Sequence, residues 1–358
     1  AQGCARIPRR QQLERDEPEA FADEDLVERG IQEVEAAAAS KDAQCMFPSV
    51  AALSYSWLCF DHPDPEGYQA ERLCEVLKAI MAWRAKMGRD PDFMIFIDFH
   101  SLYQGLPKPK QDDRTTEQMD VFKIALGNMD IVYAHAGTLV LMQKKIMPRA
   151  KCNQHGPCKL RGDYNGRGWT FTEKHWSCIC KHGTLAWDIE NFVLSDELCN
   201  APARLFRTEC KGDLAGLAMP SSYGDGSMYF ADDLPLAPLI QGAREPPVPP
   251  EVFEEMLATK EFAVESDRAV VATLFKQVTI TVLGDIVIGN FGMVAWSTKQ
   301  LEELASSLPL CHKLTTLKLS LCKMSGEGLK VFAMSLTQDA APVLEELWLN
   351  DNAFEGEE

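Results

Sequence analysis

The stretch RGWTFTEKHW, residues 167–176, places an arginine, a glutamate and two tryptophans within ten positions. A carboxylate at a helix start is common, because the free N–H groups and the helix dipole stabilise it by about 0.3–1 kcal/mol. Such a cap does not account for the two large aromatic side chains near Glu173. A carboxylate beside an aromatic wall can also stabilise a cationic transition state, as glycosidases do. Glu173 is therefore the candidate catalytic residue, with a first-turn helix acid as the alternative, and Trp176 is expected in the core.

Strand and helix patterns alternate in the part of the chain before this stretch. The run SVAALSYSWL at 49–58 is apolar, and turn residues separate it from apolar side chains at helical spacing over 68–87. An apolar run at 92–99, a helical pattern at 116–128 and an apolar run at 131–142 repeat the order. This alternation predicts a parallel α/β sheet. Ligands bind such sheets beyond the carboxyl ends of the strands, so we expect the segments after the strands to share one rim.

Composition argues against several classes of function. Asp and Glu number 53 against 36 Lys and Arg, and a net charge of −17 repels nucleic acid and anionic membranes. No apolar run reaches the ~18–20 residues that cross a bilayer. Twelve cysteines at irregular spacing, without a signal peptide, favour reduced thiols and a cytoplasmic location. The Cys and His residues between 152 and 182 do not suit a zinc site, so we expect no bound metal.

Leucines near the end of the sequence repeat at a fixed spacing. The first set recurs thirty positions later as the second: Leu314, Leu317, Leu319 and Cys322, then Leu344, Leu347, Leu349 and Asn352. This is the L-x-x-L-x-L-x-x-N/C pattern of leucine-rich repeats, and the helical segment 326–338 between the sets resembles the ribonuclease-inhibitor type. Residues 301–308 look like the helix of an earlier unit. Because a stable array needs at least three units and a cap, we expect Glu358 to end the chain inside the array.

These patterns predict four regions. Residues 1–44 form an acidic leader, helical or disordered, which we exclude from the fold. Residues 45–200 form the α/β domain, and 201–298 form an irregular, proline-rich and helical connector. Residues 299–358 form the partial leucine-rich-repeat solenoid, which would bind a protein partner. We expect limited proteolysis to cut first around 205–250.

Four segments of the α/β region, taken in order, resemble the heterokaryon-incompatibility domain. They are ALSYSWL (52–58), IDFHSLYQ (97–104), NMDIVYAHAGTLVLM (128–142) and RGWTFTE (167–173). The family patterns are L-S-Y-x-W, D-x-x-C-I-x-Q, M-x-x-I-Y-x-x-A and R-x-W-x-x-x-E, and Ser101 stands where the family usually has cysteine. That family is similar in turn to Toll/interleukin-receptor (TIR) domains. The resemblance therefore implies a three-layer, flavodoxin-like fold with a parallel sheet over residues 46–200.

The resemblance also implies a reaction. Several Toll/interleukin-receptor domains cleave NAD with one glutamate in a W-x-x-x-E motif, and Trp169 and Glu173 have this spacing. NAD would be the substrate of a glycohydrolase, and no cofactor is expected. The bond to nicotinamide would break while an ionised Glu173 stabilises the positive charge on the ribose. Nicotinamide leaves as a neutral base, so a second acid is not required.

Other side chains near the rim complete the site that this reaction would need. Tyr55, Trp57 or Trp169 would form the aromatic wall, and Arg167 would bind a pyrophosphate. Asp98 would either cap the turn that follows it or hold a ribose hydroxyl.

The resemblance thus implies an intracellular signalling or defence-type protein whose α/β domain cleaves NAD. The alternative function is a non-catalytic protein–protein interaction or scaffold module. The α/β domain would then self-associate into a homo-oligomer, while the repeats bind a protein partner. Ser101 and Gln104 are also expected at the substrate-binding rim, where they would form loop hydrogen bonds rather than act as catalysts. The two functions differ in whether Glu173 points into an open pocket with Asp98 and Tyr55 or is buried in a salt bridge.

Overall fold

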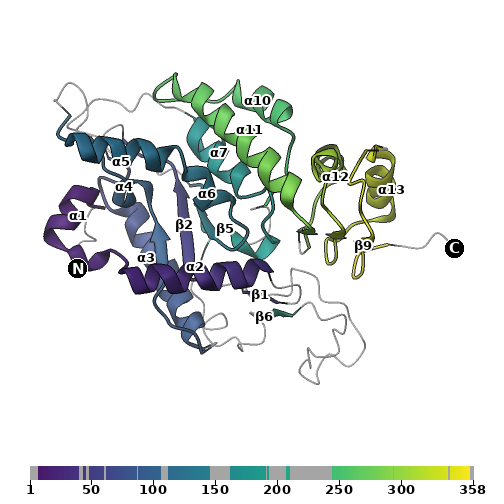
Figure 1. Cartoon of the computed structure of the whole chain (residues 1–358), viewed down its shortest axis with the longest axis horizontal. Helices are drawn as coiled ribbons and strands as arrows, with labels where there is room; N and C mark the ends of the chain where they lie inside the picture. The colour runs from purple at the N-terminus through teal and green to yellow at the C-terminus, as the bar shows by residue number, and fades with distance from the viewer. Residues whose placement is uncertain are drawn as a thin grey trace.

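The computed structural model describes residues 7–39, 43–45, 48–59, 62–86, 88–105, 112–145, 162–190, 192, 207–209, 244–292, 294–337 and 339–354. At its centre lies a four-stranded parallel sheet with the strand order β3-β2-β4-β5 (Figure 1). The strands are β2 (Val50–Tyr55), β3 (Met94–Phe96), β4 (Leu139–Gln143) and β5 (Ala186–Asp188). The mixed α/β class with a parallel-sheet core, predicted from the alternating pattern, is thereby confirmed.

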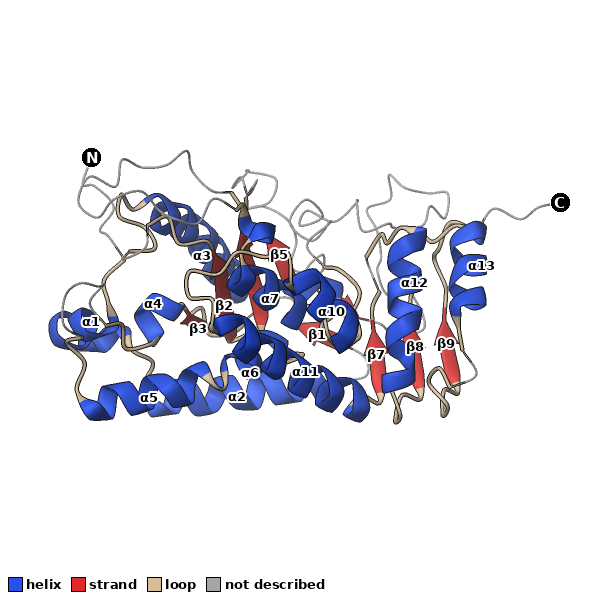
Figure 2. Cartoon of the chain, turned by 90° about the horizontal axis from the view of Figure 1, so that it is seen from above, coloured by secondary structure: helices blue, strands red, loops and turns tan. Residues whose placement is uncertain are grey.

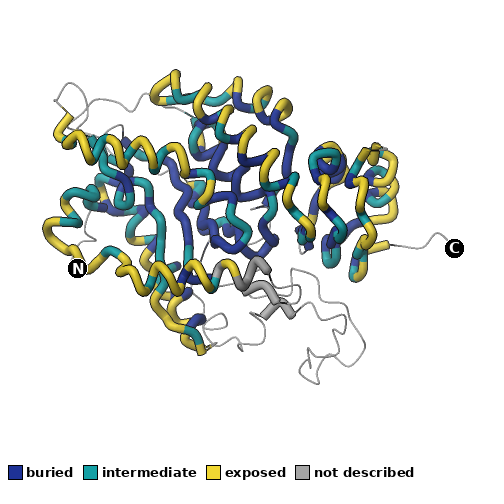
Figure 3. The backbone as a smooth tube through the Cα atoms, viewed as in Figure 1, coloured by how far each residue is buried: buried dark blue, intermediate teal, exposed yellow. Residues whose placement is uncertain are grey.

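Helices cover both faces of this sheet because successive strand residues point to opposite sides. Leu53 and Tyr55 of β2 pack with α3 (Tyr68–Lys86) in one hydrophobic cluster. Ala52, the residue before Leu53, points to the other face and belongs to a second cluster with α6 (Met129–Ala134) and α7 (Gly168–Trp176). Figure 3 shows that the buried residues concentrate along the sheet and on the helix sides that face it. The sheet is therefore the middle of three layers.

Two predicted strands are shorter in the structure. The apolar run 131–142 was expected to be one strand, but its first part belongs to α6 and only β4 is extended. Tyr133 of α6 is buried and donates a 2.9 Å hydrogen bond to the Leu53 carbonyl, and a turn at His135–Thr138 separates helix from strand. Within the run 92–99, only β3 is extended, and the last residues of the run enter the short helix α4 (Asp98–Ser101). Continuous apolar runs do not distinguish a buried helix turn from a strand.

The acidic leader is helical where it is described, and excluding it from the fold was wrong. It contains α1 (Arg10–Asp16) and α2 (Glu24–Ala39). Helix α2 lies so close to β3 that a Cβ added to Gly30 would come within 2.2 Å of Met94 Cε. A small antiparallel pair follows it, formed by β1 (Ala43–Cys45) and β6 (Arg207–Glu209). This packing could not be predicted from hydrophobic periodicity, because hydrogen bonds and ion pairs attach much of the segment to the domain.

The expected connector contributes two helices that pack on α7. They are α10 (Pro250–Leu257) and α11 (Asp267–Asp285). The rings of Phe253 and Phe275 stack with centroids 3.6 Å apart, and Phe171 of α7 stacks on Phe253 at 5.6 Å. The position of the domain boundaries stays a prediction, but this part of the connector shares the core of the α/β region.

In the α/β region, helix α5 (Thr116–Leu126) starts with a capping box between Thr115 and Gln118.

The last described part forms strand–helix units side by side (Figure 2). Strands β7 (Ile288–Asn290), β8 (Thr316–Lys318) and β9 (Glu346–Trp348) are parallel, and α12 (Thr298–Ser307) and α13 (Gly326–Ser335) connect them. Leu317 is 0% exposed, whereas its counterpart Leu347 on the edge strand is 41% exposed.

Within the described residues, no helix combines the length and the apolar character needed to span a membrane.

Candidate functional site

Glu173 lies in the second turn of α7, and its surroundings differ from those of a helix-start acid. The helix begins at Gly168 and has no acidic residue in its first turn. Glu173 is only 5% exposed. The expectation of an exposed first-turn acid was therefore wrong, because α7 starts after Arg167 and presents Glu173 to the sheet.

The Glu173 carboxyl group is held by a chain of hydroxyl groups. Ser54 of β2 donates from Oγ to Glu173 Oε2 over 2.6 Å, and the Tyr164 hydroxyl lies 2.6 Å from the same Ser54 oxygen. Burial raises the pKa of Glu173 well above its usual value, and the Asp98 charge adds to this rise, while the Ser54 hydrogen bond opposes it. This raised pKa favours the neutral form of Glu173, whereas the NAD reaction would need the ionised form.

Asp98 lies at the carboxyl end of the neighbouring strand and binds three donors. Its Oδ1 accepts from the Tyr55 hydroxyl at 2.7 Å, and its Oδ2 accepts from Trp57 Nε1 at 2.9 Å. The amide of the next residue, Phe99, donates to Oδ1 at 2.6 Å, and Asp98 is the first residue of α4 rather than its cap, which is Ile97. Burial raises the pKa of Asp98, and the hydrogen bonds from Tyr55 and Trp57 oppose the rise. The structure thus joins three of the expected site residues in one hydrogen-bonded group.

Arg167 positions the start of α7. Its Nε donates to the Gly162 carbonyl at 3.0 Å, and a second guanidinium nitrogen donates to the Trp57 carbonyl. The next residue, Gly168, donates from its amide to the Glu261 carbonyl at 2.9 Å, and Glu261 lies in the turn after α10. Arg167 is buried, so its guanidinium is committed to carbonyl groups of the protein and not presented to a pyrophosphate.

The two tryptophans of α7 have structural roles. Trp169 is half-buried and donates from Nε1 to Asp267 of α11 at 3.0 Å, so it does not join the group around Asp98. Trp176 is fully buried and its ring stacks on Tyr133. The prediction that Trp176 packs in the core is confirmed.

Ser101 and Gln104 hold the loop after β3, as expected for loop hydrogen bonders. The Ile97 amide donates to Ser101 Oγ at 3.1 Å, and Gln104 Nε2 donates to the Asp98 carbonyl at 3.1 Å. Residues of α1 bind the same loop: Arg10 donates to the Ser101 carbonyl at 2.6 Å and Gln11 donates to the Gln104 carbonyl at 2.8 Å. Sequence reasoning missed these hydrogen bonds, since Arg10 and Gln11 are separated from the loop by more than ninety residues.

Ser54, Tyr133 and Tyr164 are the main polar residues near Glu173 that sequence reasoning missed. Burial raises the pKa of both tyrosines well above the usual value, and the Glu173 charge adds to this. A signal for Ser54 did exist, because it alternates with Tyr55 in the first motif and must face the opposite side of β2. Nothing local marks Tyr164 as its partner.

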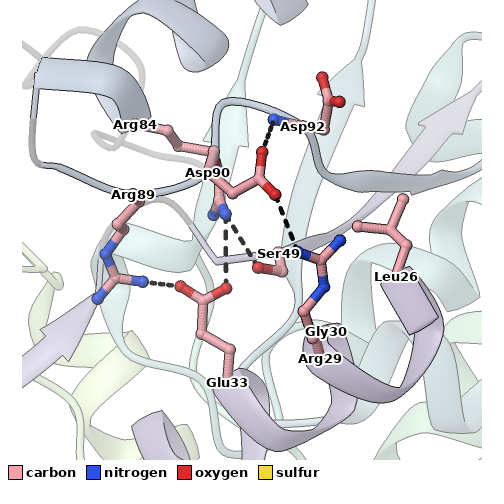
Figure 4. Close-up of a pocket in the computed structure, with 9 residues that line it drawn as sticks. All are labelled: Leu26, Arg29, Gly30, Glu33, Ser49, Arg84, Arg89, Asp90 and Asp92. Carbon is pink, nitrogen blue, oxygen red and sulfur yellow. Dashed lines mark hydrogen bonds and ion pairs between the residues drawn. The ribbon is translucent and has the colours of Figure 1, made fainter.

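A charged pocket lies at the opposite edge of the sheet, near the amino ends of the strands (Figure 4). Arg84, 1% exposed, reaches Ser49 Oγ at 3.0 Å and Glu33 of α2 at 3.5 Å. Arg89 also pairs with Glu33, and Arg29 pairs with Asp90 at 3.3 Å. Ion pairs thus fill much of the pocket and fasten α2. In the described part of the chain, Glu173 lines neither this pocket nor a second one between α10 and α11.

The described residues contain no group of three or more His, Cys, Asp or Glu side chains placed to hold a metal ion. Cys152, His155 and Cys158, which were considered for zinc, lie outside the described residues. Comparison with known proteins finds no family model, no curated protein and no solved structure that matches this chain.

Proposed function

We propose that the chain is a non-catalytic interaction module of a signalling or defence-type protein, in which a TIR-like α/β domain is joined to leucine-rich repeats. The state of Glu173 carries this proposal. An acid that stabilises a cation must be ionised and must reach the substrate, yet Glu173 is buried, its pKa is raised by burial, and it is bonded to Ser54. The geometry therefore fits an acid that ties α7 to the sheet.

The repeated units support a role in partner binding. Strands β8 and β9 pair with Thr316 opposite Glu346, which is the thirty-residue offset of the sequence pattern. Asn352 accepts from the Cys322 and Met324 amides at 2.9 and 3.0 Å, as expected for the Asn/Cys position that ends the L-x-x-L-x-L-x-x-N/C pattern. The half-buried Trp348, whose ring covers the buried Lys318 with Nζ 4.2 Å from the ring centroid, would contact the partner from the strand face.

NAD cleavage is the second candidate, and one observation favours it. Glu173 is buried and Asp98 is half-buried near the carboxyl ends of the strands, and desolvation raises the pKa of both carboxyl groups. Groups with perturbed pKa values cluster at functional sites. The strand order, with the first strand between the second and the third, is also that of flavodoxin-like folds. A rearrangement that ionises and exposes Glu173 would be needed for this reaction.

NAD consumption by the purified full chain distinguishes the two functions. The module predicts the same slow background loss of NAD for the parent and for Glu173→Gln, with and without crowding that promotes self-association. Light scattering of the same samples checks whether the chain forms a homo-oligomer. Turnover by the parent that falls at least ~10²-fold in Glu173→Gln, in a variant that stays folded, would replace the module with the glycohydrolase.

A further inference from the structure

The first residues that the structure describes lie against segments that follow the carboxyl ends of β2 and β3. Ile7 is 4% exposed, and its carbonyl accepts a hydrogen bond from His62 Nε2 at 3.1 Å. The His62 ring packs on Phe99 with 5.0 Å between centroids, and Phe99 packs edge-to-face on Trp57 at 5.4 Å. Trp57 in turn donates to Asp98. Contacts therefore run without a break from the N-terminal segment to the group around Asp98.

Helix α1 continues this contact along the loop after β3, and Figure 1 shows it beside α4. The Arg10 guanidinium donates to the Ser101 carbonyl at 2.6 Å. Gln11 donates to the Gln104 carbonyl at 2.8 Å. Residues 7–16 thus lie over the loop that follows β3, and we call them the N-terminal cover.

The N-terminal cover is held by polar contacts more than by apolar burial. Ile7 is its only buried residue, and α1 buries no side chain. Helix α1 has seven residues, and isolated helices shorter than ~12–15 residues are marginal in water. When the cover leaves, water can replace its donors at the loop carbonyls, so each lost hydrogen bond carries a small net cost. The cover can therefore be released without disturbing the sheet.

The helix that follows the cover is attached more firmly. In α2, Gly30 is buried against Met94. The buried guanidinium of Arg84 pairs with Glu33 of the same helix at 3.5 Å (Figure 4). Residues 17–23 link α1 to α2, and all but one of them are exposed. This linker allows the cover to leave the loop while α2 stays on the sheet, as in switches that order and disorder one segment.

The position of the cover gives its release a consequence. The carboxyl end of an open parallel sheet is where other molecules bind. We propose that the N-terminal cover is a releasable lid that keeps other molecules from the Asp98 group, and that its release controls association of the α/β domain with a second copy of the chain. The second part rests on the proposed interaction module. The apparent affinity of a site is reduced by the fraction of time that it is closed, so the lid weakens association without changing the sheet.

Hydrogen exchange of the full chain tests the release. Arg10→Ala removes the donor to the Ser101 carbonyl. Amides over residues 97–104 should then exchange at least ~10-fold faster, because the open state is more populated. Arg15→Ala is the matched control and should leave this exchange unchanged, since Arg15 belongs to the same helix but pairs with its exposed neighbour Asp16.

Equal exchange in Arg10→Ala and Arg15→Ala would overturn the proposal. Faster exchange that extends to β2 and β4 would also overturn it, because the cover would then be part of one cooperative fold. If Arg10→Ala does not fold, Gln11→Ala removes a single donor and keeps the Arg10 bond. It should speed exchange over 97–104 by at least ~3-fold without lowering the unfolding midpoint of the chain. A lower midpoint with unchanged exchange would show that the segment is not released separately.

Light scattering over a range of protein concentrations tests the regulatory part. The apparent dissociation constant for self-association should fall at least ~10-fold in Arg10→Ala and stay unchanged in Arg15→Ala. Faster exchange with unchanged association would refute the regulatory role. Weaker association in Arg10→Ala would refute it too, because Arg10 would then make its contact in the second copy. NAD consumption that appears in Arg10→Ala but not in the parent would support the lid and replace the interaction module with the glycohydrolase.

Discussion

Ser54 Oγ and Glu173 Oε2 lie 2.6 Å apart and join the central strand β2 to α7 across 119 positions of the sequence. The contact is wholly buried and involves a carboxyl group with a raised pKa. It makes Glu173 part of the connection between two layers of the fold. The acid that the W-x-x-x-E spacing marked for chemistry thus has a structural partner that this spacing does not reveal.

The pH dependence of stability should report the raised pKa of Glu173. A group whose pKa is higher in the folded than in the unfolded chain stabilises the fold fully below its unfolded value near 4.5, and this contribution is lost as the pH rises toward the folded value. Glu173→Gln removes the titration. Relative to this variant, the parent should lose stability above about pH 4.5, by up to ~1.4 kcal/mol per pH unit.

Urea unfolding of the parent and Glu173→Gln between pH 4 and pH 8 measures this difference. Glu254→Gln, at an exposed position of α10, controls for the removal of a surface carboxyl group. A parent and a Glu173→Gln variant with parallel pH profiles would show that Glu173 is not a buried neutral acid.

Ser54→Ala should destabilise the chain more than Tyr164→Phe does. The first change leaves the Glu173 carboxyl group without its donor, for which a loss of about 1–3 kcal/mol is expected. The second removes only the hydroxyl that bonds to Ser54 and keeps the Ser54–Glu173 bond. The loss of the Ser54 bond should also raise the pKa of Glu173 further. Unfolding free energies in the reverse order would assign the main contact to Tyr164.

Asn352→Ala should weaken the C-terminal units. Asn352 accepts from the Cys322 and Met324 amides and donates to the Leu319 carbonyl at 2.7 Å and the Leu349 carbonyl at 2.9 Å. Removing it leaves several buried backbone groups unsatisfied, so a loss of at least ~2 kcal/mol is expected. Hydrogen exchange of the β8 and β9 amides reports this loss directly.

The exposed neighbour Asn350 supplies the matched control. Asn350→Ala removes a side chain of the same type from the segment after β9, where its hydrogen bonds to Ser320 and Asp351 are exposed to water, so its effect should stay within ~0.5 kcal/mol. Equal effects of the two variants would argue against a repeat in which the asparagine supports the turn.

Limited proteolysis tests the domain boundaries. The sequence predicts the first cuts around 205–250, and we expect them before Arg244. Because Phe171, Phe253 and Phe275 share one stack, the two fragments should stay together in gel filtration under native conditions. Fragments that separate would indicate independent cores, and early cuts within 92–142 would contradict the packed parallel sheet.

Local patterns in the sequence were sufficient to predict the class of the fold and several elements. The helical spacing over 68–87 matches α3, and the alternation of apolar runs with helices led to the parallel sheet. Such signals depend on side-chain periodicity, which neighbouring residues set by themselves. The same locality explains the error at 131–142, where an apolar run fits a buried helix and a buried strand equally well.

Tertiary structure alone decided the state of the candidate site. Distant strands and loops supply the burial that raises the pKa of Glu173, two of the three donors of Asp98 and the carbonyl contacts of Arg167. Ser54 is 119 positions from Glu173, and Tyr55 is 43 positions from Asp98. The sequence determined which residues could be acids, donors and aromatic walls. Their charge and access to a ligand depend on burial, which is a property of the whole packed chain.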